Sequence, residues 1–318
     1  MTGASGFLGL AAIATLAQNG HMLRAAVRRR PEPALPPSVE IVQHSDLSED
    51  LEWHPLLDGV DQVVHLAGIA HTGRSTTPEL YDRVNRLATG KLATAAVEAG
   101  VKHFVFVSSI RAQSGPAADH ALTELDEPAP TDDYGRAKLA AEEAVRASGV
   151  PFTILRPVLL YGPRAKGNFA LLLRAALSPW PLPVKDFVNR RSLLSIGNFT
   201  SALSFVLSGA HTKGETYIVA DPGVPLRLPD VMATLRQAQG RWPLVVPMPT
   251  TVVETALRLI GRDDLWERLG GNLRVDPSKL LTAGWQPEHD TRSGLAALVQ
   301  SESRFRKTMP PTTPTPKT

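Results

Sequence analysis

Apolar residues in the first half of this chain follow two patterns in turn, one with helical spacing and one of short continuous runs. Residues 7–16 place apolar side chains at helical spacing and end at Asn19-Gly20, a signal that terminates helices. Further helices are predicted at residues 78–98 and from Tyr134 to about Arg146. Apolar runs that predict strands lie at residues 21–27, 39–43, 61–66 and 101–107. Because such runs are typical of parallel strands covered on both faces, the alternation predicts an α/β fold with a doubly wound parallel sheet.

Three glycines at a three-residue spacing stand immediately before the first predicted helix, in Thr2-Gly-Ala-Ser-Gly-Phe-Leu-Gly9. In a turn of this kind the first glycine permits the tight bend, the second admits phosphates and the third lets the helix pack closely on the sheet. The alternative, a flexible N-terminal tail, is disfavoured by the helical pattern that follows. We therefore predict a dinucleotide site at Gly3, Ser5, Gly6, Phe7 and Gly9.

Only Met1 stands where the strand before this turn would be. In a sheet of order 3-2-1-4-5-6 that strand is central, and without it two neighbouring strands keep unpaired backbone groups. We therefore expect the native start to lie upstream of Met1, a GTG valine codon having been taken as the start. Genomic DNA without in-frame upstream codons for an apolar strand would contradict this expectation.

The residues after the next strand bear on the choice of cofactor. Arg28 and Arg29 favour NADP, because an arginine can pair with its 2′-phosphate, although the arginines could also form a solvated face. Asp46, at the end of another strand, could accept a hydrogen bond from the adenine amino group or cap a turn. The small residues near the end of the run at 61–66 predict the second wall of the dinucleotide crevice, formed by Leu66, Ala67 and Gly68.

Candidate chemistry lies at the end of the run at 101–107 and on the helix that follows. Ser109 stands at the strand end, and about 25 residues later come Tyr134 and Lys138, four apart on one helix face. An ammonium close to the phenol would lower the tyrosine pKa from about 10 toward that of a general base. Ser109 would hold the reacting hydroxyl or carbonyl against the tyrosine. Asn85 either bonds across to a neighbouring loop or caps locally.

These motifs, in this order, resemble those of the extended short-chain dehydrogenases/reductases, in particular the nucleotide-sugar epimerase/dehydratase group. The resemblance covers nearly the whole chain and rests on residues 2–9, 65–68, 108–109, 134–138 and 155–163. It implies a Rossmann sheet, catalytic roles for Ser109, Tyr134 and Lys138, and backbone near Pro157 that holds the nicotinamide carboxamide.

The same resemblance extends to the expected substrate site. It implies that Asn168 contacts the nucleotide diphosphate and that Arg191, with Arg190 beside it, clamps that diphosphate. The chain departs from the family pattern after Ser109, where it has Ile-Arg-Ala-Gln-Ser. It also departs at Asn198, which we expect to serve as the N-cap of a helix over residues 199–207.

The irregular pattern beyond Pro157 predicts a division of the chain. We expect residues 1–160 to form the NAD(P)-binding domain and residues 161–309 a substrate lobe interleaved with the last strands of the sheet. The Pro- and Thr-rich residues 310–318 are predicted to be disordered.

Composition narrows the class of protein further. Among 318 residues there is no cysteine, which excludes disulfide and thiolate chemistry. The formal net charge is only +3, with Lys and Arg spread along the chain, so binding to nucleic acid is not implied. No apolar run reaches the roughly 18 to 20 residues of a membrane span, and no metal-ligand cluster is recognisable. We expect a soluble, cytoplasmic enzyme for a small nucleotide sugar, with a homodimer left open.

Three functions remain as hypotheses. A UDP-sugar 4-epimerase retains NAD and returns the hydride to the other face of the sugar, whereas a UDP-4-keto-sugar reductase consumes NADPH and releases its product. Epimerases are the more frequent activity in the family that the chain resembles, which favours the epimerase. The NADP signal of Arg28 and Arg29 favours the reductase. A non-catalytic dinucleotide-binding protein is disfavoured because Ser109, Tyr134 and Lys138 are all present.

Overall fold

The computed structural model describes residues 1–31, 34–70, 76–163, 165, 168–259, 261, 266 and 270–308, with residues 168, 210 and 302–308 described by their backbone alone. The described strands are β1 (Leu23–Val27), β2 (Val39–Gln43), β3 (Gln62–His65), β4 (His103–Val107), β5 (Ala121–Leu122), β6 (Phe152–Pro157), β7 (Leu159–Tyr161), β8 (Arg190–Arg191), β9 (Leu193–Ser195), β10 (Glu215–Val219), β11 (Leu226–Arg227) and β12 (Arg274–Val275). The described α-helices are α1 (Phe7–Gln18), α2 (His54–Leu57), α3 (Pro78–Tyr81), α4 (Ala88–Glu98), α5 (Ile110–Gln113), α6 (Asp133–Ser148), α7 (Asn168–Leu177), α8 (Ile196–Ser208), α9 (Leu228–Gln237), α10 (Thr250–Leu259), α12 (Ser278–Thr282) and α13 (Thr291–Thr308).

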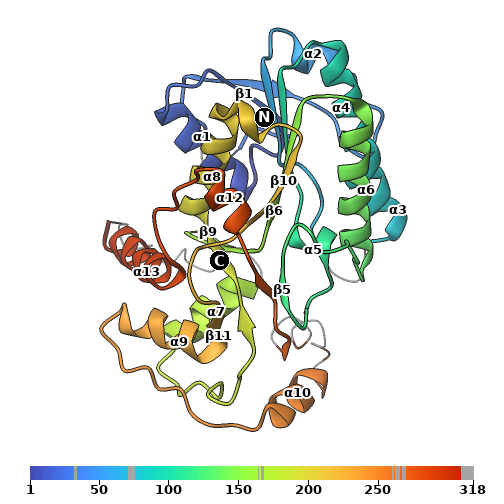
Figure 1. The fold of residues 1–318 in the computed structure, drawn as a ribbon. Helices are drawn as coiled ribbons and strands as arrows, with labels where there is room; N and C mark the ends of the chain where they lie inside the picture. Colours follow the sequence, from blue (N-terminus) through green and yellow to red (C-terminus); the bar gives the residue numbers. More distant parts are fainter. Residues whose placement is uncertain are drawn as a thin grey trace, which may run out of the picture.

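A parallel sheet lies at the centre of the molecule (Figure 1). Strands β3, β4, β6 and β10 pair in that spatial order, and β1 pairs with β2, every pair parallel. Thr2 joins the two groups through parallel bridges to Ala26 and His65. The resulting order, β2-β1-Thr2-β3-β4-β6-β10, is that of a doubly wound sheet, so the predicted fold class is confirmed.

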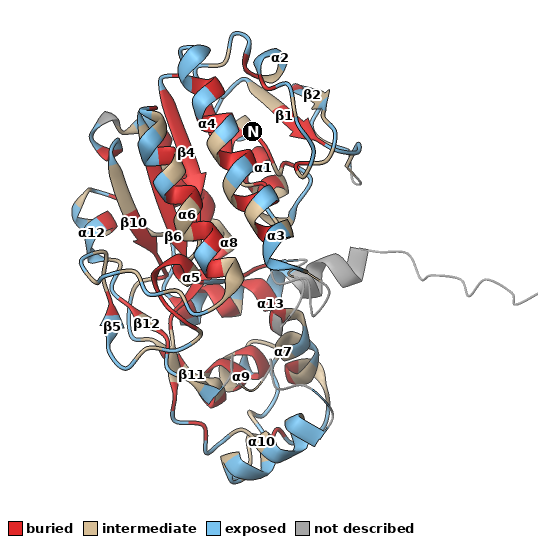
Figure 2. Ribbon diagram, turned by 90° about the vertical axis from the view of Figure 1, so that its right-hand side faces the viewer, coloured by how far each residue is buried: buried red, intermediate tan, exposed pale blue. Residues whose placement is uncertain are grey.

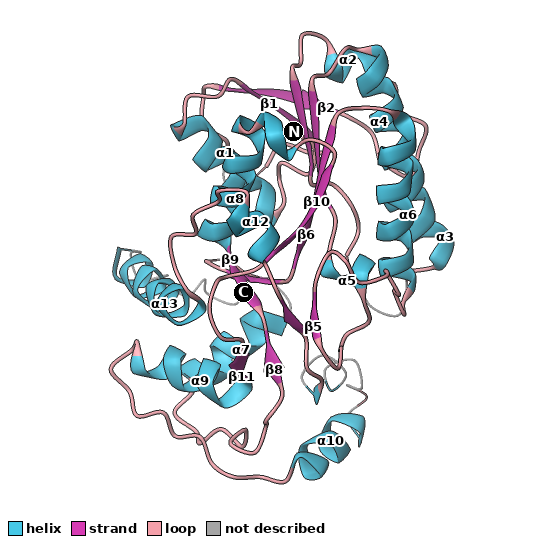
Figure 3. Cartoon of the chain, viewed as in Figure 1, coloured by secondary structure: helices cyan, strands magenta, loops and turns pink. Residues whose placement is uncertain are grey.

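Helices cover both faces of this sheet (Figure 3). Along β4, Phe104 and Phe106 pack in one core with α4 and α6, while Val105 and Val107 pack in another with α1 and α8. Successive side chains of a strand point to opposite faces, so a strand covered on both sides must be apolar throughout. Figure 2 shows the consequence, with buried residues along β4 and β6 and on the helix faces turned toward them.

The centre of the sheet is occupied over two residues only. Met1 accepts a hydrogen bond from the Ala26 amide (2.8 Å), and Thr2 donates its amide to Val64 (3.0 Å). Beyond Met1 a cavity of about 730 Å³ extends between β1 and β3, with Trp53, Leu92 and Leu207 among its lining residues. The backbone edges of two parallel strands therefore face each other across this cavity.

The predicted helix at residues 78–98 is helical but not uniform. Between α3 and α4 the chain forms a π-helical segment, Asp82–Leu87, which contains Asn85. Such segments widen a helix locally and occur often at functional sites.

A smaller lobe lies below the sheet in Figure 1, built on α7, α9 and α13. Its core includes Phe169, Leu235 and Leu295. Short strand pairs β7–β9 and β8–β11 adjoin it, while β10 is the edge strand of the main sheet beside β6 and α8 packs on that sheet. The predicted disorder of residues 310–318 concerns residues outside the described ones. No helix in the described part of the chain has both the length and the apolar character to cross a membrane.

The expected helix N-cap at Asn198 is wrong. Helix α8 begins at Ile196, and its cap is Ser195, whose hydroxyl accepts from the Asn198 amide (3.0 Å). The Asn198 side chain is fully buried and donates to Asp221 Oδ1 (2.7 Å) and to the His289 carbonyl (2.8 Å). Asn198 therefore joins the first turn of α8 to the segment before α13 and does not serve as the N-cap of the helix.

Candidate active site

The glycine turn has the geometry that its spacing predicts. Gly3 has a φ of +67°, and a Cβ there would lie 2.7 Å from the Ala67 nitrogen. A Cβ on Gly9 would overlap the Gly3 carbonyl oxygen and lie 2.7 Å from Ala4 Cα. Gly6, by contrast, has only the Gly3 oxygen near its Cβ position, at 3.2 Å. Close backbone packing thus requires glycine at positions 3 and 9, whereas the space beside Gly6 is largely open.

Gly6 is also the N-cap of α1. No side chain caps this end, and no acidic residue lies in the first turn. The first amides of the helix and its positive dipole end are therefore available to an anion. Ser5 is exposed beside Gly6, and Phe7 opens the helix. This cradle fits the pyrophosphate of a dinucleotide.

Leu66, Ala67 and Gly68 follow β3, and Leu66 and Ala67 lie against this turn. Gly68 has a φ of +158°, and a Cβ there would lie 2.8 Å from Asn85 Oδ1 and 3.6 Å from Lys138 Nζ. Asn85 accepts from the Ile69 amide and donates to the Ile69 carbonyl, both at 2.9 Å. Of the two roles left open for Asn85, the structure shows the bond to a neighbouring loop.

A chain of buried polar groups links this loop to the sheet centre. His65 Nδ1 lies 2.6 Å from Thr2 Oγ1, and its Nε2 lies 2.9 Å from Thr89 Oγ1. Burial lowers the pKa of His65 to about 3, so the imidazole is neutral. His65 stands inside the motif at residues 65–68, but its burial and its two hydroxyl partners could not be inferred from the sequence.

At the ends of β1 and β2, Arg28 and Asp46 form an ion pair. Hydrogen bonds from Ser48 and the nearby Arg28 lower the pKa of Asp46. Arg29 is exposed. The structure thus brings two predicted cofactor residues together, with the Arg28 charge already engaged by a carboxylate.

Ser109, Tyr134 and Lys138 meet at the carboxyl edge of the sheet. Ser109 is the N-cap of α5 and accepts from the Arg111 amide (3.1 Å), while Tyr134 is the second residue of α6. A hydrogen bond with Ser109 joins the two side chains and opposes the effect of burial, which raises the pKa of Tyr134 to about 12. Tyr134 is therefore a neutral phenol at physiological pH.

The described contacts of the Lys138 ammonium are with the end of β4. The ammonium donates to the Val107 carbonyl (3.0 Å) and lies 4.7 Å from the centre of the Phe106 ring. Burial lowers the pKa of Lys138 to about 8. Burial prevails at the Tyr134 phenol, and the expectation that Lys138 lowers its pKa stays a prediction.

Two further features place the helix that carries Tyr134. The Asp132 side chain caps α6 by accepting from the Gly135 amide (2.7 Å), and it also pairs with Arg111. A Cβ on Gly135 would overlap the Arg111 carbonyl oxygen, so α5 and α6 are in direct backbone contact. Arg111 lies in the segment that departs from the family pattern, and its pairing with Asp132 could not be inferred from the sequence.

Pro157 ends β6, next to the β4 end that leads to Ser109. The Ser108 amide donates to the Leu155 carbonyl (2.8 Å), which holds these two strand ends side by side. The predicted carboxamide-binding backbone and the predicted catalytic serine therefore share one edge of the sheet.

Of the two residues predicted to contact the nucleotide diphosphate, the structure describes the side chain of Arg191 only. Asn168 begins α7, but its side chain lies outside the described part of the chain. Arg191 donates to the carbonyls of Gly271 (2.9 Å) and Pro116 (3.0 Å). Burial and the nearby charge of Arg111 lower its pKa to about 10. Arg191 is thus held close to the segment that follows Ser109. The two neighbouring positive charges of Arg191 and Arg111 favour the binding of an anion there.

A sheet of this order, with a glycine turn at its centre and a Tyr-Lys pair beside it, defines a dinucleotide-dependent enzyme of the short-chain dehydrogenase/reductase type. The model of the NAD dependent epimerase/dehydratase family matches residues 1–220, and the chain belongs to this family. NAD or NADP is accordingly the cofactor of the class. Within the described residues no group of three His, Asp or Glu side chains is placed to hold a metal ion.

Relatives within this class include epimerases and reductases. A UDP-glucose 4-epimerase of Vibrio cholerae is 30% identical over 314 residues, which cover 95% of this chain and 94% of the relative. A ceramide reductase of Caulobacter vibrioides is 29% identical over 302 residues, covering 90% and 85%. The structure of MoeE5 in complex with UDP-glucose and NAD has a TM-score of 0.75 at 25% identity and covers 96% of this chain and 98% of that one. These relatives support a nucleotide-sugar enzyme that uses a nicotinamide cofactor.

Proposed function

We propose that the protein is a UDP-sugar 4-epimerase that acts by transient hydride transfer at sugar C4. The observation that carries this proposal is the meeting of Ser109 and Tyr134 at the sheet edge that Pro157 shares, in a chain aligned over nearly its full length with a UDP-glucose 4-epimerase. The sequence has no cysteine, which is consistent with a reducing compartment such as the cytoplasm. A cytoplasmic location stays a prediction.

Each residue has a distinct part in the proposed reaction. The turn at Gly3, Gly6 and Gly9 holds the pyrophosphate, and Ser109 bonds the reacting oxygen of the sugar. When bound, oxidised NAD supplies a hydride acceptor and a positive charge. Tyr134 is a phenol in the structure; it would lose its proton to solvent when the positive charges of the bound cofactor and of Lys138 favour the phenolate. The phenolate would then take the proton of the sugar hydroxyl and return it as an acid.

The test is whether the cofactor stays with the protein. An epimerase must return the hydride it has removed, so the purified protein should carry about one NAD per chain and interconvert UDP-glucose and UDP-galactose, or their N-acetyl forms, without added nucleotide. Cofactor content is measured by chromatography of the heat-denatured protein. Protein that purifies empty and leaves UDP-sugars unchanged would remove the epimerase proposal.

A UDP-4-keto-sugar reductase is the second candidate, because Arg28 and Arg29 lie at the end of β1 and a reductase is among the relatives. This enzyme would purify largely empty and oxidise NADPH only with a keto-sugar present. Replacing both arginines by Ser should abolish a preference for NADPH over NADH. Retention of that preference in the variant would show that Arg28 and Arg29 do not recognise the 2′-phosphate.

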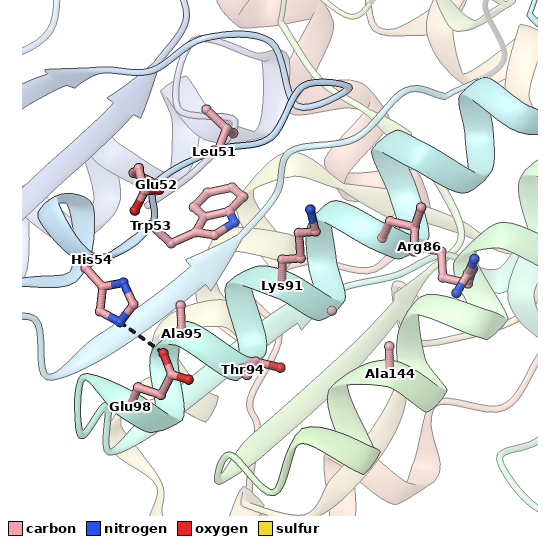
Figure 4. Close-up of a pocket in the computed structure, with 12 residues that line it drawn as sticks. Leu51, Glu52, Trp53, His54, Arg86, Lys91, Thr94, Ala95, Glu98 and Ala144 are labelled. Carbon is pink, nitrogen blue, oxygen red and sulfur yellow. Dashed lines mark ion pairs between the residues drawn. The ribbon is translucent and has the colours of Figure 1, made fainter.

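We also propose a homodimer through the outer face of α4 and α6. The two helices pack closely, since a Cβ on Gly90 would lie 3.3 Å from Ala144 Cβ, and Leu87 on this face is exposed. A hollow of about 480 Å³ lies here, and Figure 4 shows Lys91 and the His54–Glu98 ion pair (3.0 Å) among its lining residues. A surface with both signs of charge can meet a copy of itself across a twofold axis.

Light scattering during size-exclusion chromatography tests the dimer. Thr94→Arg, in this hollow, should give a monomer, whereas Val252→Arg on the exposed face of α10 should not change the mass. A monomeric parent protein would refute the interface.

A further inference from the structure

A pair of opposite charges is buried beside α6, on the face of this helix that carries Lys138. Glu142 is fully buried and Arg156 is 3% exposed. Arg156 donates from Nε to Glu142 Oε1 (2.9 Å) and from Nη2 to Oε2 (2.6 Å). Removing two charges from water is costly, and an apolar pair of similar volume is often as stable. Stability alone therefore does not account for this pair.

The pair contacts the segments that carry the site residues. Ser108, the neighbour of Ser109, donates to Glu142 Oε1 (2.6 Å). Arg156 directly precedes Pro157 and also donates to the Gln113 side chain, at the end of the helix that Ser109 caps. Glu142 thus joins α6 to the end of β4, and Arg156 joins β6 to α5.

Glu142 also lies one helical turn beyond Lys138, on the same face. Burial lowers the pKa of Lys138, and the nearby Glu142 carboxylate opposes this by raising it. The described charged and titratable groups around the Lys138–Tyr134 face are Glu142, Asp132 and Arg146 on or at the end of α6, His65 on β3, Arg156 on β6, Arg111 on α5 and Tyr81 on α3. His65 is neutral, and Asp132 is paired with Arg111.

We propose that the Glu142–Arg156 pair is a positioning element of the reaction: it holds the strand ends that lead to Ser109 and Pro157 against α6, and its carboxylate keeps the ammonium of Lys138 charged. This inference rests on the proposed roles of Tyr134 and Lys138. It adds two residues that touch neither substrate nor cofactor and act through their neighbours.

The sign of the effect follows from the structure. Lys138 is charged below its pKa, which is about 8, and loses its charge above it. Without the Glu142 carboxylate this pKa falls, so the charged form is lost at lower pH. The activity that depends on it should decline earlier on the basic side, by about one pH unit or more for a nearby opposite charge.

The experiment uses the full chain and two variants. Glu142→Gln keeps the shape and removes the charge, and the double variant Glu142→Leu/Arg156→Met replaces the pair by apolar groups. We expect the double variant to melt near the parent temperature and to bind NAD within about threefold. Its kcat should fall about tenfold or more at pH 8, with the basic limb of the pH profile displaced downward.

Thr153→Val is the matched control on the same strand. Thr153 is fully buried, donates to the Thr212 carbonyl (2.8 Å) and lies 2.8 Å from His103 Nε2, at the other end of β6. Its loss should lower the melting temperature without moving the basic limb. A double variant that folds and keeps the parent pH profile and kcat would overturn the proposal.

A second measurement needs neither substrate nor the double variant. Lysine labelled at the ε carbon reports the titration of Lys138 by NMR, assigned with Lys138→Arg. In Glu142→Gln the Lys138 signal should titrate at lower pH than in the parent, and an unchanged titration would refute the electrostatic part. Full activity of Tyr134→Phe would instead refute the proposed function, so the two failures are distinguishable.

Discussion

Replacing Gly9 by Ala tests whether the turn before α1 holds a pyrophosphate. Gly9 is buried, and the added Cβ would overlap the Gly3 oxygen and lie 2.7 Å from two backbone atoms of Ala4. Because these neighbours are backbone atoms, α1 must move away from the turn. The amides at its first turn then leave the positions from which they would bind phosphate.

The size of the effect follows from the bonds lost. Two amide bonds to a charged phosphate contribute about 1.5 to 3 kcal/mol each, so about 3 to 6 kcal/mol is at stake. At about 1.4 kcal/mol for each factor of ten, NAD should bind roughly 10² to 10⁴ times more weakly. Calorimetric titration of cofactor-free protein with NAD measures this difference.

Gly197→Ala is the matched control, because Gly197 also lies in the first turn of a helix, α8. A Cβ there meets nothing nearer than Glu288 Oε2, at 3.6 Å. This variant should bind NAD like the parent. If Gly9→Ala folds and binds NAD within about threefold of the parent, the turn is not the pyrophosphate site.

Four further predictions concern the chemistry, the substrate and the sheet. Tyr134→Phe should bind NAD normally and lose about 10² to 10⁴-fold in kcat, and unchanged turnover would exclude Tyr134 as the acid and base. Since the pKa of Lys138 is about 8, activity that needs its charge should be full below that pH and decline as the pH rises through it; a pH–rate profile that stays flat well above 8 would contradict this. Arg191→Leu should weaken UDP binding by about 1.5 to 3 kcal/mol with little effect on NAD, as measured by calorimetry, and equal UDP affinity would place Arg191 outside the site. An apolar extension of about five residues ahead of Met1 should raise the melting temperature by several degrees. The reason is that each apolar side chain buried in the cavity between β1 and β3 contributes about 1.5 to 3 kcal/mol, before the cost of ordering the added residues is subtracted. A lower melting temperature would show that the cavity does not accept a strand.

Local sequence patterns were sufficient to predict the fold class and to propose much of the candidate site. Uniformly apolar strands such as β4 can only be covered on both faces, and the Gly3, Gly6 and Gly9 spacing admits few backbone geometries. The four-residue interval between Tyr134 and Lys138 placed both on one face of α6. These features depend on neighbours along the chain, which the sequence displays directly.

Charge states and long-range partners were decided only by the tertiary structure. Burial raises the pKa of Tyr134 and lowers that of Lys138, and the amount of burial depends on elements distant in the sequence. The pairing of Arg28 with Asp46, like that of Glu142 with Arg156, joins residues more than ten positions apart. The one-turn spacing from Lys138 could have pointed to Glu142, but its arginine partner could not be inferred. Which polar side chains lose their water, and which partners replace that water, is settled only when the strands and helices pack together.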